Sequence, residues 1–152
     1  MMNELHDSGE RTVYASGAVR DTGIHKGRCD LLPLHFIAYL LRGDQFLMAM
    51  DDFLESKEPD DLKVAFQMFV VKHYDGDIYT AILELSKQFE DGLQKYSASQ
   101  WSRGMPIHRF IDSSLRHYFQ YLRGDKDEPH KRACLWNILC AWYTLEIGRA
   151  HV

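Results

Sequence analysis

The sequence has no apolar run of the roughly 18 to 20 residues that a membrane-spanning helix needs. Its densest apolar stretch, residues 31–41, is interrupted by Pro33 and His35. Residues 1–10 carry three acidic side chains and no apolar segment of the kind that a signal peptide contains. We therefore expect no membrane partner and a location in the cytoplasm.

Cysteine is also scarce. Cys29, Cys134 and Cys140 make an odd number, and no two of them have the CxxC spacing of a structural zinc site. This pattern argues against a disulfide framework. We expect all three thiols to be reduced, with two of them in the core.

The chain lacks the excess of basic residues that a nucleic-acid-binding surface requires. Its formal net charge is −4 and its isoelectric point is near 6.0, so we expect no DNA partner. The charge is uneven, because residues 44–91 hold twelve acids and four bases, whereas residues 101–132 hold four acids and seven bases. The bases of the second segment interleave with aromatic residues, which keeps a small anionic ligand as a candidate partner.

Several catalytic motifs are missing. The sequence contains no GxxxxGK[ST] phosphate loop, no GxGxxG, no HExxH and no GxSxG. Helical magnesium pyrophosphohydrolases hold the ion with acids spaced i, i+3 on two facing helices, because Mg²⁺ needs several oxygen ligands at once. Asp52, Glu55, Glu58 and Asp61 step by three, but Pro59 interrupts the helix beneath them. We therefore expect no catalytic residue, no metal and no cofactor.

Two other residue spacings leave a metal-binding site as the less favoured alternative. Asp125 and Glu128 are three residues apart just before Pro129, where a solvated turn and helix cap is the favoured interpretation. His130 and Cys134 are four residues apart, but no third or fourth ligand is evident. A packed cysteine beneath a histidine at a helix start is the better interpretation of that pair.

The spacing of apolar residues, glycine and proline predicts an all-α fold. We expect one domain over residues 1–152: a compact bundle of about six helices, with an N-terminal arm or short β-hairpin in residues 1–30. Two β-prone pieces, Arg11–Ala15 and Ala18–Arg20, would form that hairpin. The predicted helices cover residues 31–42, 45–56, 61–73, 77–96, 106–122 and 129–146.

Polar and glycine residues mark the expected helix ends. Asp30 and Asp60 are predicted to cap the first and third helices, and Gly43, Gly124 and Gly148 to end the first, fifth and sixth. The apolar positions of the third and fourth helices predict two core faces, respectively Leu62, Ala65, Phe66, Phe69 and Val70, and Ile78, Ala81, Ile82, Leu85 and Phe89.

Asp112, Arg116, Phe119 and Arg123 follow spacings of four, three and four, which place them on one stripe of the fifth helix. Taken alone, the stripe favours an acid–base pair on a solvated helix face. Apolar residues flank it on both sides, however, so the arginines border packed surface. A guanidinium group in such a place suits a phosphate, to which it donates two parallel hydrogen bonds.

Two further groups of residues fit a nucleotide. Phe89, near the end of one helix, and Trp101, in the following loop, could stack on a base, although each taken singly is more often a core residue. Lys26 and Arg28 lie among glycines whose backbone amides could approach an anion.

A set of short motifs, in order over residues 16–147, resembles a phage protein family often labelled a dATP/dGTP diphosphohydrolase amino-terminal domain. Because residues 44–76 form a helical insertion, the chain is similar to the first-described Thoeris anti-defence sponges within that family. The motifs are Ser16–Asp21, Lys26–Pro33, Phe89–Gly92 with Lys95, Tyr96 and Trp101, Gly104–His108, Ile111–Ser113, Arg116–His117, Leu122–Asp125, Asp127–His130 and Trp136–Asn137.

The resemblance implies a phage protein that acts in the cytoplasm of the infected bacterial host. Such proteins are helical homo-oligomers that bind and sequester a cyclic ADP-ribose-type signal, glycocyclic ADP-ribose made by TIR-domain enzymes, without degrading it. Some also hold cyclic trinucleotides. The expected partners are therefore this nucleotide signal, with cyclic trinucleotides as a further candidate, and other copies of the chain in a dimer or hexamer.

The resemblance also implies a binding site. In it, Phe89 would stack on adenine. Arg116 would hold the pyrophosphate, with Arg123 as a second candidate. Asp112 would orient Arg116 or accept ribose hydroxyls.

Five more residues join the expected binding set. Trp101 would wall the pocket next to Gln100, where the family usually has asparagine, and His117 follows Arg116. Lys26 and Arg28 would contribute near a subunit boundary or to a second ligand site.

Two alternatives stay open. One is a magnesium-dependent dATP/dGTP pyrophosphohydrolase that uses Glu90, Asp112, Asp125 and Glu128; its enzyme-like relatives carry Gly-Glu where this chain has Gly124-Asp125. The other is a structural interaction module, which would bind no nucleotide.

Overall fold

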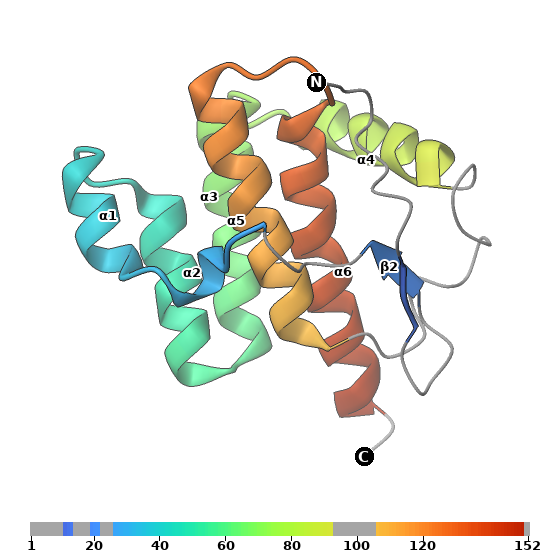
Figure 1. Ribbon diagram of the computed structural model, residues 1–152, viewed down its shortest axis with the longest axis horizontal. Helices are drawn as coiled ribbons and strands as arrows, with labels where there is room; N and C mark the ends of the chain where they lie inside the picture. The colour runs from blue at the N-terminus through green and yellow to red at the C-terminus, as the bar shows by residue number, and fades with distance from the viewer. Residues whose placement is uncertain (1–10, 14–18, 22–25, 93–105, 151–152) are drawn as a thin grey trace.

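The computed structural model describes residues 11–13, 19–21, 26–92 and 106–150. Its described part is all-α apart from one short strand pair, in agreement with the predicted class (Figure 1). The helices are η1 (Cys29–Leu31, a 3-10 turn), α1 (Leu34–Leu40), α2 (Gln45–Ser56), α3 (Pro59–His73), α4 (Ile78–Gly92), α5 (Ile107–Arg123) and α6 (His130–Ala150).

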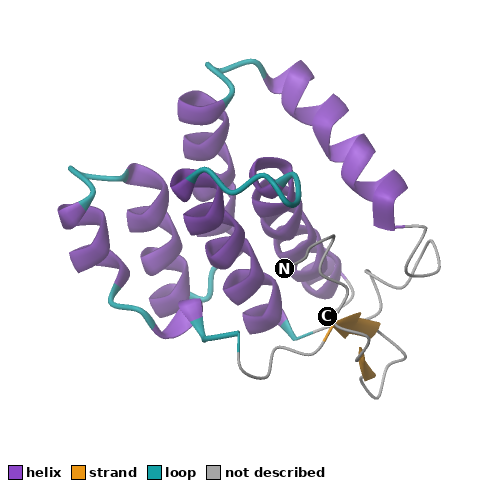
Figure 2. Cartoon of the chain, turned by 45° about the horizontal axis from the view of Figure 1, so that its top comes forward, coloured by secondary structure: helices purple, strands orange, loops and turns teal. Residues whose placement is uncertain are grey.

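Helices α5 and α6 lie side by side and form the centre of the bundle. Helix α3 contacts both α6 and α2, α1 packs on α2, and α4 makes its most extensive described contact with α6 (Figure 2). The largest fully buried side chains come from α1, α2, α3, α5 and α6, and include Tyr118, Phe46, Phe69, Phe110, Leu62 and Leu135. The core therefore draws its largest side chains from the five other α-helices, and α4 adds the smaller contribution of Ala81 and Leu85.

The first helix starts later than the sequence predicts. Leu32 is extended (φ −69°, ψ 147°), and Pro33 stands at the N-cap of α1. A proline disfavours the helical conformation of the residue before it. The prediction that Asp30 caps a continuous helix is therefore wrong: residues 29–31 form the separate turn η1, and the Asp30 side chain pairs with Arg28.

Helices α2 and α3 form a helical hairpin. The predicted bounds of α2 are confirmed, and Asp44 caps it by accepting a hydrogen bond from Leu47 N at 2.9 Å. Helix α3 begins at Pro59, whose missing N–H costs nothing at a first helical position. Asp60 therefore lies inside the first turn, and the prediction that it caps α3 is wrong. All five predicted core residues of α3 are buried.

Helix α4 buries less than its pattern predicts. Ala81 and Leu85 are buried, but Ile78 and Ile82 are exposed. Within the described residues, its one extensive contact is with α6, so the apolar stripe is wider than the surface that covers it. Its predicted end at Tyr96 lies outside the described residues.

The ends of the last two helices differ in how well they were predicted. Helix α5 ends at Gly124, whose φ of +91° is the left-handed value that favours glycine, as predicted. Helix α6 continues past Gly148 to Ala150, so the prediction of a stop there is wrong. A glycine inside a helix costs about 1 kcal/mol, which a 21-residue helix tolerates.

Strands β1 (Arg11–Val13) and β2 (Val19–Asp21) pair antiparallel, with Thr12 opposite Arg20. The residues that connect them lie outside the described ones, so a hairpin stays a prediction. Cys29, Cys134 and Cys140 are free, and the two on α6 are buried, as expected. None of the described helices combines the length and the apolar character that crossing a bilayer would require.

Candidate functional site

Asp112 and Arg116 form a buried ion pair on α5. They are one helical turn apart, and Arg116 Nη2 donates to Asp112 Oδ2 at 2.5 Å. Asp112 Oδ1 accepts a second hydrogen bond from Cys29 N at 2.7 Å. The Asp112 side chain is 4% exposed and that of Arg116 is 20% exposed. Asp112 thus holds Arg116 and also attaches η1 to α5, while its role toward a ligand stays a prediction.

Arg116 makes a further contact with the segment before η1. Its Nη2 donates to the carbonyl oxygen of Gly27 at 2.9 Å. Gly27 has a φ of +86°, a left-handed value that glycine adopts without strain. This conformation turns the chain so that Lys26, Gly27 and Arg28 lie next to Arg116. We call residues 26–30 together with Asp112 and Arg116 the η1–α5 junction.

The junction gathers cations that are distant in sequence. Lys26 and Arg28 are exposed, and Arg28 donates two 2.8 Å hydrogen bonds to the carboxylate of Asp30. Burial would raise the pKa of Asp30, but the Arg28 guanidinium outweighs it and lowers that pKa below its ordinary value. Burial raises the pKa of the Cys29 thiol, so this thiol stays neutral at pH 7. The junction therefore presents Lys26, Arg28 and Arg116 together with the carboxylates of Asp30 and Asp112.

Arg116 keeps donors for a ligand. Both of its hydrogen bonds use Nη2, and its buried Nε has no hydrogen-bond partner. A guanidinium group has five N–H donors, and no contact described above uses the two on Nη1, whereas the Nε proton is buried away from solvent. An anion at the junction would find an arginine whose position is already held by Asp112.

Phe89 lies at a different contact, between α4 and α6. Its ring meets the Trp136 ring edge-on, with centroids 5.7 Å apart. Arg132 of α6 donates to Gln88 at 3.1 Å and also pairs with Asp91, so it fixes this end of α4. Phe89 is half-buried there. Its predicted stacking on adenine stays a prediction, and Gln100 and Trp101 lie outside the described residues.

Arg123 and His117, two more residues of the predicted binding set, have different partners from Asp112 and Arg116. Arg123 is 71% exposed and donates to both oxygens of Asp125, at 2.9 and 2.5 Å. His117 Nδ1 lies 2.8 Å from His130 Nδ1, and His130 Nε2 lies 2.8 Å from Asp127 Oδ1. Arg123 and His117 are thus placed at the turn between α5 and α6, whereas Asp112 and Arg116 face η1.

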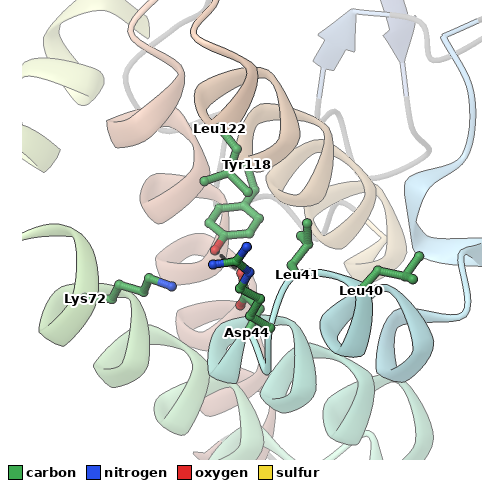
Figure 3. A pocket seen from close by; sticks show the side chains of 7 residues that line it. Leu40, Leu41, Asp44, Lys72, Tyr118 and Leu122 are labelled. Carbon is green, nitrogen blue, oxygen red and sulfur yellow. Dashed lines mark hydrogen bonds between the residues drawn. The ribbon is translucent and has the colours of Figure 1, made fainter.

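Sequence reasoning missed a polar network beneath a surface pocket. Tyr118 donates a short hydrogen bond to the buried Asp44, and His73 lies 3.3 Å from the Tyr118 hydroxyl. Figure 3 shows Lys72 extending from α3 toward this pair. The open pocket has a volume of about 360 Å³ and is lined by Leu40, Leu41, Arg42, Asp44, Lys72, Tyr118 and Leu122. None of the predicted site residues lines it, and no sequence spacing links Asp44 to Tyr118.

Comparison with known proteins gives one family. The model for "dATP/dGTP diphosphohydrolase, N-terminal" matches residues 55–150, more than half of the chain. The chain belongs to this family. Among curated proteins and among solved structures, the comparison found no match.

The dATP/dGTP diphosphohydrolase N-terminal match covers only part of the η1–α5 junction. It begins at the end of α2 and includes Asp112, Arg116 and the whole α5–α6 turn. Lys26 and Arg28 precede it. The family's region therefore supplies the ion pair on α5, and the segment before it supplies Gly27, which Arg116 contacts, and the exposed cations on either side of Gly27.

Proposed function

We propose that this chain binds an adenine nucleotide with a diphosphate linkage, of the cyclic ADP-ribose type, and retains it without cleaving it. The observation that carries the proposal is Arg116, held by buried Asp112 next to Lys26 and Arg28. An arginine fixed in this way loses little side-chain entropy when it binds a phosphate. Two neighbouring cations add to the local positive charge that a diphosphate would meet.

Phe89 is the proposed contact for the base. It is half-buried at the α4–α6 contact beside Trp136, so it presents an aromatic surface already fixed by packing. An aromatic side chain that stacks on a base contributes about 1 to 3 kcal/mol. Cyclic trinucleotides are a further candidate ligand, because they combine the same bases with phosphates.

The proposed setting is the cytoplasm of an infected bacterium, where a phage protein would sequester an immune signal. The chain would act there as a homo-oligomer. This setting rests on the resemblance of the sequence motifs to the Thoeris anti-defence sponges, and family membership is consistent with it.

The family's description favours a second candidate, a magnesium-dependent dATP/dGTP pyrophosphohydrolase. The acids predicted for that reaction are Glu90, Asp112, Asp125 and Glu128. Both oxygens of Asp112 already accept hydrogen bonds, from Cys29 N and Arg116. The Arg116 guanidinium that pairs with Asp112 would repel a divalent cation at that carboxylate, which favours sequestration.

One experiment separates the two candidates. Purified protein is mixed with the cyclic ADP-ribose-type signal, or with dATP and magnesium, then heat-denatured, and the supernatant is chromatographed. Recovery of intact signal supports sequestration. Release of pyrophosphate from dATP, lost in Asp112→Asn, would establish the hydrolase instead.

A variant tests the site itself. Arg116→Ala is expected to weaken binding of the cyclic signal by at least about 1.5 kcal/mol, the value of a charged hydrogen bond, measured by calorimetry. Lys63→Ala, which removes an exposed cation of α3, is the matched control and should bind as the parent does. Circular dichroism checks that both variants keep their helix content. Equal affinity of Arg116→Ala and the control would remove Arg116 from the site.

A further inference from the structure

The turn between α5 and α6 brings together three side chains with metal-binding atoms. Asp125, Asp127 and His130 each offer one such atom, and these atoms lie within 4.8 Å of one another. Residues 26–92 and 106–147 contain no other group of three or more histidine, cysteine or acidic side chains whose ligand atoms lie this close together. None of the expected nucleotide contacts uses Asp127 or His130.

We propose that Asp125, Asp127 and His130 form a binding site for a divalent transition-metal ion such as Zn²⁺ or Mn²⁺. One imidazole nitrogen and two carboxylate oxygens are a ligand set that suits these ions, whereas Mg²⁺ and Ca²⁺ prefer oxygen ligands alone. The proposal does not depend on the proposed nucleotide function.

Burial differs among the three ligands in a way that suits an open metal site. The His130 side chain is 1% exposed, and it stands at the first position of α6, so the protein holds its ring in place. The Asp127 and Asp125 side chains are 28% and 25% exposed. An ion could therefore enter from solvent and keep positions for water or another ligand, as three-ligand metal sites do.

His117 supplies the support that a metal-bound histidine requires. A coordinating imidazole usually has its second nitrogen held by another polar group, which orients the ring. Here His130 Nε2 faces Asp127, and its Nδ1 lies 2.8 Å from Nδ1 of His117.

The hydrogen bonds of the two rings can rearrange to accommodate the ion. Without an ion, the distances fit tautomers in which His130 Nε2–H donates to Asp127 and His117 Nδ1–H donates to His130 Nδ1. With an ion on Nε2, His130 would carry its proton on Nδ1 and donate it to His117 Nδ1, and the proton of His117 would move to its own Nε2.

Arg123 competes with the ion for Asp125. It occupies both carboxylate oxygens, and it lowers the pKa of Asp125 by its hydrogen bond and charge. Because the Arg123 side chain is 71% exposed, it can leave without uncovering any core. Removing it should strengthen metal binding, which a merely structural role of these acids would not predict.

The test uses the full chain without an affinity tag, stripped with EDTA and titrated with Zn²⁺, Mn²⁺ or Mg²⁺ by calorimetry. We expect one Zn²⁺ per chain, and at least about tenfold weaker binding in Asp127→Asn. We expect tighter binding in Arg123→Gln. Asp52→Asn is the matched control, because Asp52 is an exposed acid 3.4 Å from His35, a histidine outside the cluster; its affinity should equal that of the parent.

Nuclear magnetic resonance of ¹⁵N-labelled histidine rings gives an independent readout. Zn²⁺ should move the proton of His130 from Nε2 to Nδ1 and that of His117 from Nδ1 to Nε2. Equal Zn²⁺ affinity in the parent and Asp127→Asn, or a spectrum in which other histidines respond instead of His130, would overturn the proposal. Nucleotide retention measured in EDTA tests the proposed function separately, so the two can fail independently.

Discussion

Asp112 connects two segments through a single carboxylate. It is buried, and its oxygens accept hydrogen bonds from Cys29 N and from Arg116, which in turn donates to Gly27. Removing one member of such a buried pair leaves the other without compensation.

We expect Asp112→Ala to lower the free energy of unfolding by about 3 kcal/mol, because Arg116 and the Cys29 N–H would lose their acceptor. Urea titration followed by circular dichroism measures this. Glu55→Ala, at an exposed position of α2, serves as the control and should change stability by less than about 0.5 kcal/mol. A loss as small as the control's would show that the pair contributes no net stability.

His73 makes stability depend on pH. Burial, with a smaller contribution from Lys72, lowers its pKa from 6.5 to about 4, although Asp44 acts in the opposite direction and Lys131 adds to the lowering. Its nitrogens lie 3.1 and 3.3 Å from the hydroxyls of Tyr121 and Tyr118. Above pH 6.5 the ring is neutral in the folded and unfolded chains, so it has no effect there. As the pH falls toward 4, the unfolded chain takes up the proton first, and the folded state loses stability.

Replacing the ring should remove this dependence. Between pH 7 and pH 5, we expect the parent to lose about 1 kcal/mol more unfolding free energy than His73→Gln, a value reduced for partial solvent screening. Denaturant titrations at the two pH values measure the difference. Parallel losses in both proteins would contradict the assignment to His73.

At the scale of elements, the turn that ends α5 depends on one glycine. Gly124 has a φ of +91°, which brings the chain from α5 into the turn that carries Asp125 and Asp127. A side chain would fit there in space, since nothing lies within 4 Å of the place that a Cβ atom would occupy, but the backbone angle would be strained.

We expect Gly124→Ala to destabilise the protein by about 1 kcal/mol. Gly92→Ala is the matched comparison: Gly92 has helical backbone and open space around it, so alanine there should be neutral or stabilising by up to about 1 kcal/mol. Thermal unfolding of both variants measures the contrast. Equal shifts of the melting temperature would show that the angle at Gly124 costs nothing.

Helix α4 shows that the helices packed against an element decide how much of its apolar face is buried. Ile78, Ile82 and Leu85 repeat at helical spacing, yet of these three only Leu85 is buried, because the one extensive contact of α4 in the described part of the chain is with α6. Periodicity records which side chains are apolar on one face. It does not show how much of that face the neighbouring helices will cover in the folded protein.

At the scale of the whole molecule, exposed apolar side chains gather before and along α1. They are Leu31, Leu32, Phe36, Tyr39, Leu40 and Leu41, each at least 37% exposed. Apolar surface of this extent is common at subunit interfaces, and we expect the chain to form a homo-oligomer, a dimer or hexamer, through it.

Light scattering coupled to gel filtration tests this expectation. The change of Tyr39 to Asp should reduce the mass of the assembly toward that of one chain, 17.8 kDa, because a charge would be buried at the interface. Tyr79→Asp is the matched comparison. Tyr79 lies on α4 and is 78% exposed, close to the 75% exposure of Tyr39. Dissociation by Tyr79→Asp alone would place the interface on α4 instead.

Much of the fold followed from the sequence, whereas the site followed only in part. The bounds of α2, the core face of α3 and the glycine end of α5 were predicted, because each depends on residues close together in the chain. The Asp112–Arg116 pair was also foreseen from a four-residue spacing on one helix. The contacts of His117 with His130 and of Tyr118 with Asp44 were not, because they join separate helices.

The sequence by itself determined that this chain is helical and roughly where its helices begin and end. Only the tertiary structure decided that Arg116 meets Gly27, 89 positions earlier, and that Cys29 N donates to Asp112, 83 positions later. The physical reason is that helix formation follows from hydrogen bonds within four residues, whereas contacts between segments depend on how the helices rotate and pack around their shared core.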